Sequence, residues 1–438
     1  MELFDVRAQL ERRERTILVG IEWVPRRAND LEPYESLGEL AELANTAGLE
    51  VVCQLLVRRE RPHPATLIGR GKVEELRHLA EELQADAVLF DEDLTTAQMR
   101  NLDRALKVKV LDRTDVILNI FSQRAHTREA RIQVELAQWE YSLPRLRRAW
   151  THLDRVVGAG SGVAGGVGTR GPGETQLQMD RRMIQQRIRQ LRKELAEVVQ
   201  HRRVQRKRRK ETQAFSVALV GYTNAGKSSL LNALTGERHV ETEDKLFKTL
   251  DPTTRRLRLE TGQEVLLTDT VGFIRRLPHH LVAAFRATLE EVHEADLLLH
   301  VVDGSHPNVP VLMETVRQVL EELDADQIPT LLVINKVDLI APEDRKLLEA
   351  EYPEAIFTSA ITGEGLGRLR EQIASQAAGQ ESEYLFRLSH DEGRWLSYLY
   401  EHGRVEQVEY DELGITVVAA LPPRFLSPLA GRVLSQEG

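Results

Sequence analysis

The chain has 438 residues, of which 42% are hydrophobic and 29% are charged, and its formal net charge is −9. This length is too great for one ordinary domain and suggests about three, and the composition is typical of a folded soluble protein. The single cysteine, Cys53, excludes an intrachain disulfide and a cysteine-cluster metal site, and it favours a reducing compartment. The N-terminal residues do not form a signal peptide, and no apolar run approaches the ~20 residues that cross a bilayer. We therefore expect a cytoplasmic protein without a membrane span.

Residues 1–112 alternate short apolar runs with helical patterns. The runs are TILVGIEW, LEVVCQLLV, DAVLF and VKVLD, and patterns such as KVEELRHLAEELQ lie between them. This alternation predicts a small N-terminal α/β domain with a mostly parallel sheet. The segment Gly69-Arg70-Gly71-Lys72 could hold a phosphate and give this domain an enzymatic activity of its own. It lacks the full P-loop spacing, however, and a tight turn before the helix is the alternative.

Residues 113–212 are helical and increasingly basic, which predicts a helical hairpin. Pro144 should interrupt its first arm, and residues 176–212 continue as one long polar helix. The Gly-rich loop at 157–174 joins the two arms and would form the tip. A ~25-residue arm would be ~37 Å long, so the tip could lie far from the globular domains.

Basic side chains dominate residues 181–210, where the only acids are Glu194 and Glu197. One strongly basic segment in an acidic protein suggests contact with a polyanion. The arginines that could neutralise RNA phosphates are Arg187, Arg189, Arg192, Arg202, Arg203 and the RKRRK run. The alternatives are a solvated charged helix and, for the glycines, a plain flexible linker.

Residues 213–378 alternate strands and helices again. RRLRLE and EVLLTD are separated by Thr261-Gly262-Gln263, which predicts a hairpin and one antiparallel strand in a mixed sheet. SVALVG, LLLHVVD and PTLLVIN are the other main strands. Residues 379–438 predict a small separate α+β module of the form βαββ. The fold class is therefore a multidomain α/β protein.

A phosphate-binding loop lies between the first strand of residues 213–378 and its following helix. Gly221 to Ser228 reads GYTNAGKS, which matches GxxxxGKS. Glycines let the backbone N–H groups of such a loop wrap phosphates closely. Lys227 would reach the β- and γ-phosphates, and the Ser228 hydroxyl would bind Mg²⁺. A Gly-rich strand-to-helix turn without a ligand is the alternative.

A second motif, DTVG at 269–272, ends the next apolar strand. Asp269 could hold Mg²⁺ through water, and the Gly272 N–H could sense the γ-phosphate. The next residue is Phe273, where many Ras-like GTPases use glutamine to orient the attacking water. Since phenylalanine cannot do this, another group or a partner must.

Guanine specificity is predicted by NKVD at 335–338. The Asp338 carboxylate can accept two hydrogen bonds from guanine, whereas adenine lacks those donors and would leave it unpaired. Asn335 would brace the loops, the Lys336 stem would cover the ring, and Ser359-Ala360 would complete the base pocket.

A GTPase also needs a mobile threonine that ligates Mg²⁺ only when the γ-phosphate is present. The segment LFKTLDPTTRR lies between the two phosphate motifs and offers Thr249, Thr253 and Thr254. The residues alone leave this choice open, and an ordinary polar loop is the alternative.

With these motifs, the chain resembles the HflX-type GTPases, a ribosome-associated branch of the translation-factor GTPases. The resemblance covers nearly the whole chain and is most specific in GGVGTRGPGETQLQMDRR, GYTNAGKSSL, FKTLDPT and LLTDTVGFIRRLPHHLVAAFRATLEE. Gln178 departs from the family pattern, which usually has glutamate there. The resemblance implies an N-terminal α/β domain with a helical hairpin, a G domain and a small C-terminal domain. By match to the family motif, Thr249 becomes the Mg²⁺ ligand beside Ser228.

The resemblance also implies binding of GTP and GDP, slow hydrolysis, and association with the large ribosomal subunit and its RNA. Some members separate stalled or idle ribosomes into subunits under heat stress. The predicted function is therefore a GTPase, expected as a monomer, that the ribosome stimulates and that dissociates ribosomes. A protein-partnered signalling switch is the alternative, which the basic hairpin argues against.

The catalytic candidates are Lys227, Thr249 and Asn224, where Asn224 would help to hold K⁺ as a charge near the β–γ bridge. Alternatively, Asn224 only braces its own loop. The predicted nucleotide-binding residues are Gly221, Tyr222, Thr223, Asn224, Ala225, Gly226, Lys227, Ser228, Ser229, Phe247, Lys248, Thr249, Leu250, Asp251, Asp269, Thr270, Val271, Gly272, Asn335, Lys336, Val337, Asp338, Ser359 and Ala360.

Overall fold

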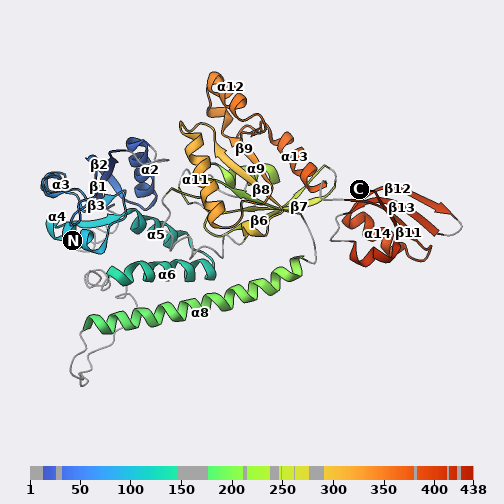
Figure 1. Cartoon of the computed structure of the whole chain (residues 1–438), viewed down its shortest axis with the longest axis horizontal. Coiled ribbons are helices and arrows are strands. Elements are labelled where there is room, and N and C mark those ends of the chain that lie inside the picture. The colour runs from blue at the N-terminus through green and yellow to red at the C-terminus, as the bar shows by residue number, and fades with distance from the viewer. Residues whose placement is uncertain are drawn as a thin grey trace, which may run out of the picture.

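The structure is a computed structural model of the chain (Figure 1). It describes residues 13–25, 32–145, 176–210, 215–236, 246–247, 249–260, 262–275, 291–378, 382–411, 414–421 and 426–437. The Gly-rich loop at 157–174 and Lys248, which the sequence assigns to the hairpin tip and the nucleotide site, lie outside these residues.

The N-terminal domain is a four-stranded parallel sheet between two layers of helices, as the alternating pattern predicts. The strand order is β2-β1-β3-β4, and each neighbouring pair is parallel. Successive residues of a strand point to opposite faces, so Leu18 packs with Leu37 and Leu40 on one face while Ile17 packs with Leu76 on the other. The elements are β1 (Arg15–Trp23), α2 (Pro33–Thr46), β2 (Glu50–Arg59), α3 (Arg70–Glu82), β3 (Ala87–Phe90), α4 (Thr96–Leu106) and β4 (Lys109–Asp112).

The described residues that follow form α5 (Arg113–Arg124), α6 (Arg128–Ser142) and the long α8 (Gln176–Lys210). The predicted first arm is two helices, because Thr127 begins a new one: its hydroxyl accepts a hydrogen bond from the Ala130 N–H at 3.1 Å. Pro144 does interrupt the arm, since α6 ends at Ser142 and the last residues described before the gap, Leu143–Arg145, form the short 3-10 helix η1.

The helices α6 and α8 lie side by side (Figure 1). Their contact is a small apolar core in which Ile132 and Leu136 of α6 meet Ile184, Ile188 and Leu191 of α8. The three- and four-residue spacing places these side chains on one stripe of each helix. Leu195 and Val198 of α8 pack against the same core, so the basic helix is held along this stripe.

The G domain is a six-stranded mixed sheet of order β10-β9-β8-β5-β7-β6. The hairpin of β6 and β7 is antiparallel and the other pairs are parallel, which confirms the predicted mixed sheet. The elements are β5 (Phe215–Val220), α9 (Lys227–Thr235), β6 (Thr253–Arg258), β7 (Glu264–Asp269), β8 (Leu297–Asp303), α11 (Val309–Glu322), β9 (Thr330–Asn335), η2 (Val337–Leu339), α12 (Pro342–Glu351), β10 (Ile356–Phe357) and α13 (Leu366–Ala378).

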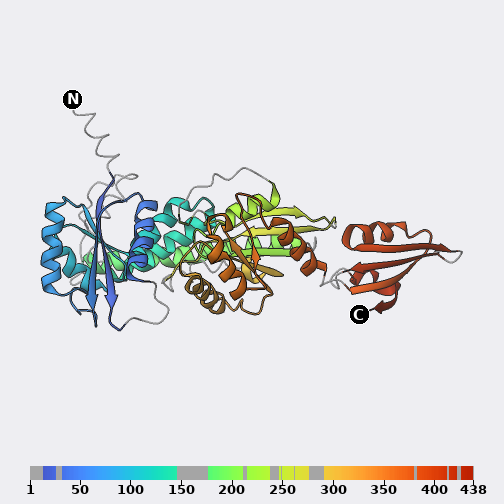
Figure 2. The ribbon, with the colours of Figure 1, turned by 90° about the horizontal axis from the view of Figure 1, so that it is seen from above.

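The C-terminal module is an antiparallel sheet of order β12-β13-β11-β14 with α14 packed on it, and it forms the red body in Figure 2. The predicted βαββ pattern is present, but the strand β14, which pairs with β11, was not predicted. The elements are β11 (Ser382–Leu388), α14 (Gly393–His402), β12 (Arg404–Asp411), β13 (Gly414–Leu421), η4 (Ser427–Arg432) and β14 (Val433–Glu437).

One apolar core crosses from the N-terminal domain into the G domain. It includes Phe121 of α5, Phe247 and Phe273 of the G domain, and Val316 of α11, all buried. The rings of Phe121 and Phe247 meet edge to face, with centroids 4.7 Å apart. The nucleotide motifs are therefore packed directly against the N-terminal half of the chain.

Candidate functional site

The P-loop joins β5 to α9, and two of its glycines have no room for a side chain. Gly221 has φ +154° and a Cβ there would lie 2.1 Å from the Val301 carbonyl oxygen. Gly226 has φ +89° and a Cβ would lie 2.3 Å from Nδ2 of Asn335. The backbone is thus free to curve around a phosphate, as the motif predicts.

The Lys227 side chain is buried inside this loop. Its Nζ donates to the carbonyl oxygens of Gly221 at 3.0 Å and Tyr222 at 2.8 Å. Burial lowers the pKa of Lys227 to about 8, and the nearby Asp269 carboxylate opposes that shift. The negative charge of a bound phosphate would favour the charged ammonium form of Lys227.

Three oxygens converge beside the P-loop. Ser228 Oγ lies 2.9 Å from Thr249 Oγ1 and 2.6 Å from Asp269 Oδ2, and Thr249 Oγ1 lies 2.8 Å from that same carboxylate oxygen. The other candidate threonines are elsewhere, because Thr253 and Thr254 begin β6 and the Thr254 hydroxyl bonds Thr268 at 3.0 Å. Hydroxyl and carboxylate oxygens are the ligands that Mg²⁺ prefers, so the donor set fits this ion.

The base loops are tied to the P-loop by Asn335. Its Nδ2 donates to the Ala225 carbonyl at 3.0 Å, and its Oδ1 accepts from the Ala360 N–H at 3.3 Å. Asp338 is exposed, and its Oδ1 accepts from the Ser359 hydroxyl at 2.5 Å. The three predicted segments therefore come together in one place.

Lys336, another predicted base-loop residue, has φ +64° and forms an ion pair with Asp303 at 2.7 Å. Asp303 is the last residue of β8, the strand beside β9. The position of the Lys336 stem is thus set by the neighbouring strand.

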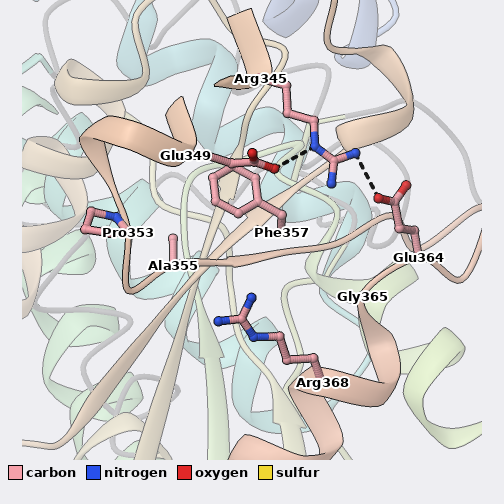
Figure 3. Close-up of a pocket in the computed structure, with 8 residues that line it drawn as sticks. All are labelled: Arg345, Glu349, Pro353, Ala355, Phe357, Glu364, Gly365 and Arg368. Atoms are coloured by element: carbon pink, nitrogen blue, oxygen red, sulfur yellow. Dashed lines mark hydrogen bonds and ion pairs between the residues drawn. The ribbon is translucent and has the colours of Figure 1, made fainter. Parts of the chain in front are cut away.

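A pocket of about 460 Å³ adjoins the base loop between α12, β10 and α13 (Figure 3). Arg345 bonds Glu349 at 2.9 Å and Glu364 at 2.8 Å, and the Glu364 carbonyl accepts from the Ser359 N–H at 3.0 Å. None of the predicted nucleotide-binding residues lines this pocket. The ion pair of Arg345 with Glu364 connects α12 to the base loop.

The segment after DTVG pairs with the P-loop. Thr223 N–H donates to the Phe273 carbonyl at 2.7 Å, and Phe273 N–H donates to the Gly221 carbonyl at 3.1 Å. The Phe273 side chain is buried in the shared core. A Cβ at Gly272 would lie 3.1 Å from Lys227 Nζ, so this backbone runs directly against the Lys227 ammonium.

A buried polar network connects these motifs to the N-terminal domain. The Tyr222 hydroxyl donates to Glu39 and accepts from the Arg275 N–H at 3.0 Å. The Arg275 guanidinium donates to Ser36 Oγ at 2.6 Å. Burial raises the pKa of Tyr222, so the phenol stays protonated and donates.

Arg113 lies at the centre of the same network. Its guanidinium bonds Glu39, the Asp91 carboxylate at 2.8 Å and the Arg275 carbonyl at 3.3 Å. Asp91 and Arg113 directly follow β3 and β4. Open α/β sheets bind ligands at this edge, where the strand order reverses. Here the Arg275 segment of the G domain occupies that place.

Sequence reasoning missed this network, since Arg113 and Glu39 are 74 residues apart and Arg275 and Ser36 are 239 apart. No local pattern links such pairs.

Asp251 was predicted to contact the nucleotide, but the structure directs its carboxylate to α6. It accepts hydrogen bonds from the N–H groups of His126 and Thr127, each at 3.1 Å, and from the Thr127 hydroxyl at 2.5 Å. Both carboxylate oxygens are engaged in this way.

Two of the arginines predicted to contact RNA also have partners within the protein. Arg187 forms two hydrogen bonds with Glu135, at 2.8 and 2.9 Å, and Arg192 bonds Glu140 at 2.7 Å. Arg189 is exposed, while the side chains of Arg202 and Arg203 lie outside the described residues. The basic face of α8 is thus partly used to hold α6.

Four family models together match most of the chain. They are described as GTP-binding GTPase N-terminal (34–122), GTP-binding GTPase Middle Region (124–209), 50S ribosome-binding GTPase (216–336) and HflX C-terminal domain (347–422). Across the residues that the structure describes, no helix is both long and apolar enough to cross a membrane.

Curated relatives match over nearly the full length. GTPase HflX of Caldanaerobacter subterraneus is 45% identical over 97% of this chain and 94% of its own. GTPase HflX of Escherichia coli is 44% identical over 87% of this chain and 88% of its own. The solved structure of a GTP-binding protein from Sulfolobus solfataricus in complex with GDP is 24% identical, covers 84% of this chain and 99% of its own, and has a TM-score of 0.44. With the guanine-nucleotide motifs assembled in one site, the chain belongs to the HflX family of GTPases.

Proposed function

We propose that this GTPase binds the large ribosomal subunit and dissociates stalled or idle ribosomes while hydrolysing GTP to GDP and phosphate. The observation that carries the proposal is a basic helix, α8, packed along α6 and continuing toward a G domain whose family model is a 50S ribosome-binding GTPase. A switch that acts only on protein partners would not need such a helix.

The charge on α8 supports contact with RNA phosphates. Its exposed cations include Arg181, Arg182, Arg189 and Lys193. Each phosphate that such a cation neutralises releases counterions, so binding should weaken steeply as salt rises. Because Arg187 bonds Glu135, the helix can present this charge without losing its position on α6.

In this proposal Ser228 and Thr249 would hold Mg²⁺, with the Asp269 carboxylate beside them. The ion would offset negative charge on the β- and γ-phosphates. Lys227 Nζ would donate to the β- and γ-phosphates, and the Gly272 N–H beside it would donate to the γ-phosphate. The Asp338 carboxylate selects guanine.

A monovalent cation near the phosphates is a further part of the proposal. Asn224 has φ +62° and is exposed, and within the described part of the chain its amide has no hydrogen-bond partner. This favours a side chain available to K⁺ over one that braces its own loop. K⁺ would supply positive charge near the β–γ bridge, where Phe273 offers no polar atom.

The test is co-sedimentation with purified ribosomal subunits at low and high salt, together with GTP hydrolysis with and without subunits. Arg189→Glu should weaken binding severalfold, whereas Arg100→Glu, the same change on an exposed residue of α4, should not. Deleting residues 158–173 should abolish ribosome dissociation and leave nucleotide binding intact. Equal binding by both charge variants, or hydrolysis that ignores the subunits, would favour the signalling alternative.

A further inference from the structure

We propose that Asp251 is a positioning residue which fastens the Thr249 segment to the corner between α5 and α6. The position of α6 would then affect binding of the γ-phosphate, and binding of the γ-phosphate would affect the position of α6. This inference rests on the proposed role of Thr249 as a residue that holds Mg²⁺.

The first anchor is the cap that Asp251 places on α6. The first N–H groups of a helix have no partner within it, and its positive end favours a carboxylate. The Asp251 carboxylate lies beside this end of α6 in space. It accepts hydrogen bonds from His126 N–H, Thr127 N–H and the Thr127 hydroxyl. Hydrogen bonds to an ionised carboxylate are stronger than neutral ones. The contact therefore holds a G-domain segment against the arm.

The second anchor lies on the other side of Thr249. Phe247 is buried and meets Phe121 of α5 edge to face at 4.7 Å. Leu250, next to Thr249, is also buried in the shared core. Thr249 is thus held on both sides by contacts with the helical segment that precedes the G domain.

The anchors leave the Thr249 side chain aimed at the metal site. Its hydroxyl lies 2.9 Å from Ser228 Oγ and 2.8 Å from Asp269 Oδ2. Both Asp251 oxygens are occupied by α6, so Asp251 itself does not serve the nucleotide in this arrangement. Its effect on nucleotide binding passes through the position of Thr249.

A reciprocal effect follows. In many GTPases the γ-phosphate and its metal must order the threonine loop. Here α6 already orders it, so GTP should bind better when α6 is in place. By linkage, GTP should also hold α6 more firmly than GDP does. A ribosome that moves α6 would then change the position of Thr249 at the metal site.

The experiment compares Asp251→Asn and Thr127→Val with Thr95→Val in the full-length protein. Thr95 caps α4 of the N-terminal domain through the Gln98 N–H, and so controls for loss of a helix cap. The readout is calorimetric affinity for a non-hydrolysable GTP analogue and for GDP, without ribosomes. Asp251→Asn and Thr127→Val should each weaken the analogue about tenfold relative to GDP and raise the Mg²⁺ concentration that analogue binding needs.

The double variant should weaken the analogue by less than the two single variants combined, because each single variant removes the hydrogen bond between Asp251 and the Thr127 hydroxyl. Thr127→Ser keeps the hydroxyl and should restore the preference for the analogue. Equal losses for GDP and analogue, no loss at all, or the same effect from Thr95→Val would overturn the inference. Since ribosomes are absent, such a result would leave the proposed ribosome function standing, and failed ribosome binding would leave this inference standing.

Discussion

Lys227 should make nucleotide binding depend on pH. Burial lowers its pKa to about 8 in the nucleotide-free protein, while the ordinary value is 10.5. Bound phosphates favour the charged ammonium and should raise the pKa at least to that ordinary value. The pKa is therefore higher in the complex, so binding takes up a proton. Affinity should be full below pH ~8 and should fall as the pH rises through that value.

The magnitude follows from the two pKa values. Between pH ~7 and ~8.5 the protonated fraction of free Lys227 falls from about nine-tenths to about one-quarter, so affinity for GDP should drop about fourfold, or ~0.8 kcal/mol. At pH ~8 binding should take up about half a proton. This range keeps guanine N1 protonated, so the ligand contributes little to the change.

Calorimetry of GDP binding in buffers with different ionisation enthalpies measures both quantities. Lys227→Met should bind GDP more weakly at neutral pH but lose the proton uptake. A wild-type affinity that stays constant over this range, with no proton uptake on binding, would show that Lys227 is fully charged in the free protein. The argument from burial would then be wrong.

Asp338→Asn should weaken GDP binding and favour xanthine nucleotides, because an amide suits their changed donor pattern; competition binding measures this, and unchanged guanine preference would contradict it. Arg113→Met removes a buried guanidinium shared by the buried Asp91 and the partly buried Glu39, so stability to urea should fall by about 3–5 kcal/mol. A loss below ~1 kcal/mol would show that water reaches this network. GTP hydrolysis should be faster in KCl than in NaCl at equal ionic strength, and Asn224→Ala should remove the difference; rates indifferent to the cation in both proteins would exclude K⁺.

Much of the fold could be predicted because its signals are local. Buried parallel strands such as LLLHVVD are continuous apolar runs, and the P-loop needs glycine wherever its backbone meets Val301 or Asn335. The break before α6 also had a local signal, since Thr127 is a favoured N-cap residue, but the helical pattern around it concealed the break.

The rest depends on contacts between distant segments. Arg187 looks like an RNA ligand in the sequence, and only the packing of α8 on α6 reveals Glu135 as its partner. The motif likewise assigns Asp251 to the nucleotide, because it cannot show that α6 begins beside it. The nucleotide contacts of the individual residues remain predictions, as do the domain boundaries.

The length of α8 has a mechanical consequence. Its 35 residues make a rod of about 52 Å at 1.5 Å per residue. A turn of only ~10° about one end would carry the other end through about 9 Å, the width of a helix. Since α8 is packed on α6 by apolar side chains and α6 starts at the Asp251 carboxylate, the rod converts small angles into large displacements. A shift too small to break a hydrogen bond at the metal site could thus become a large movement at the far end of the helix.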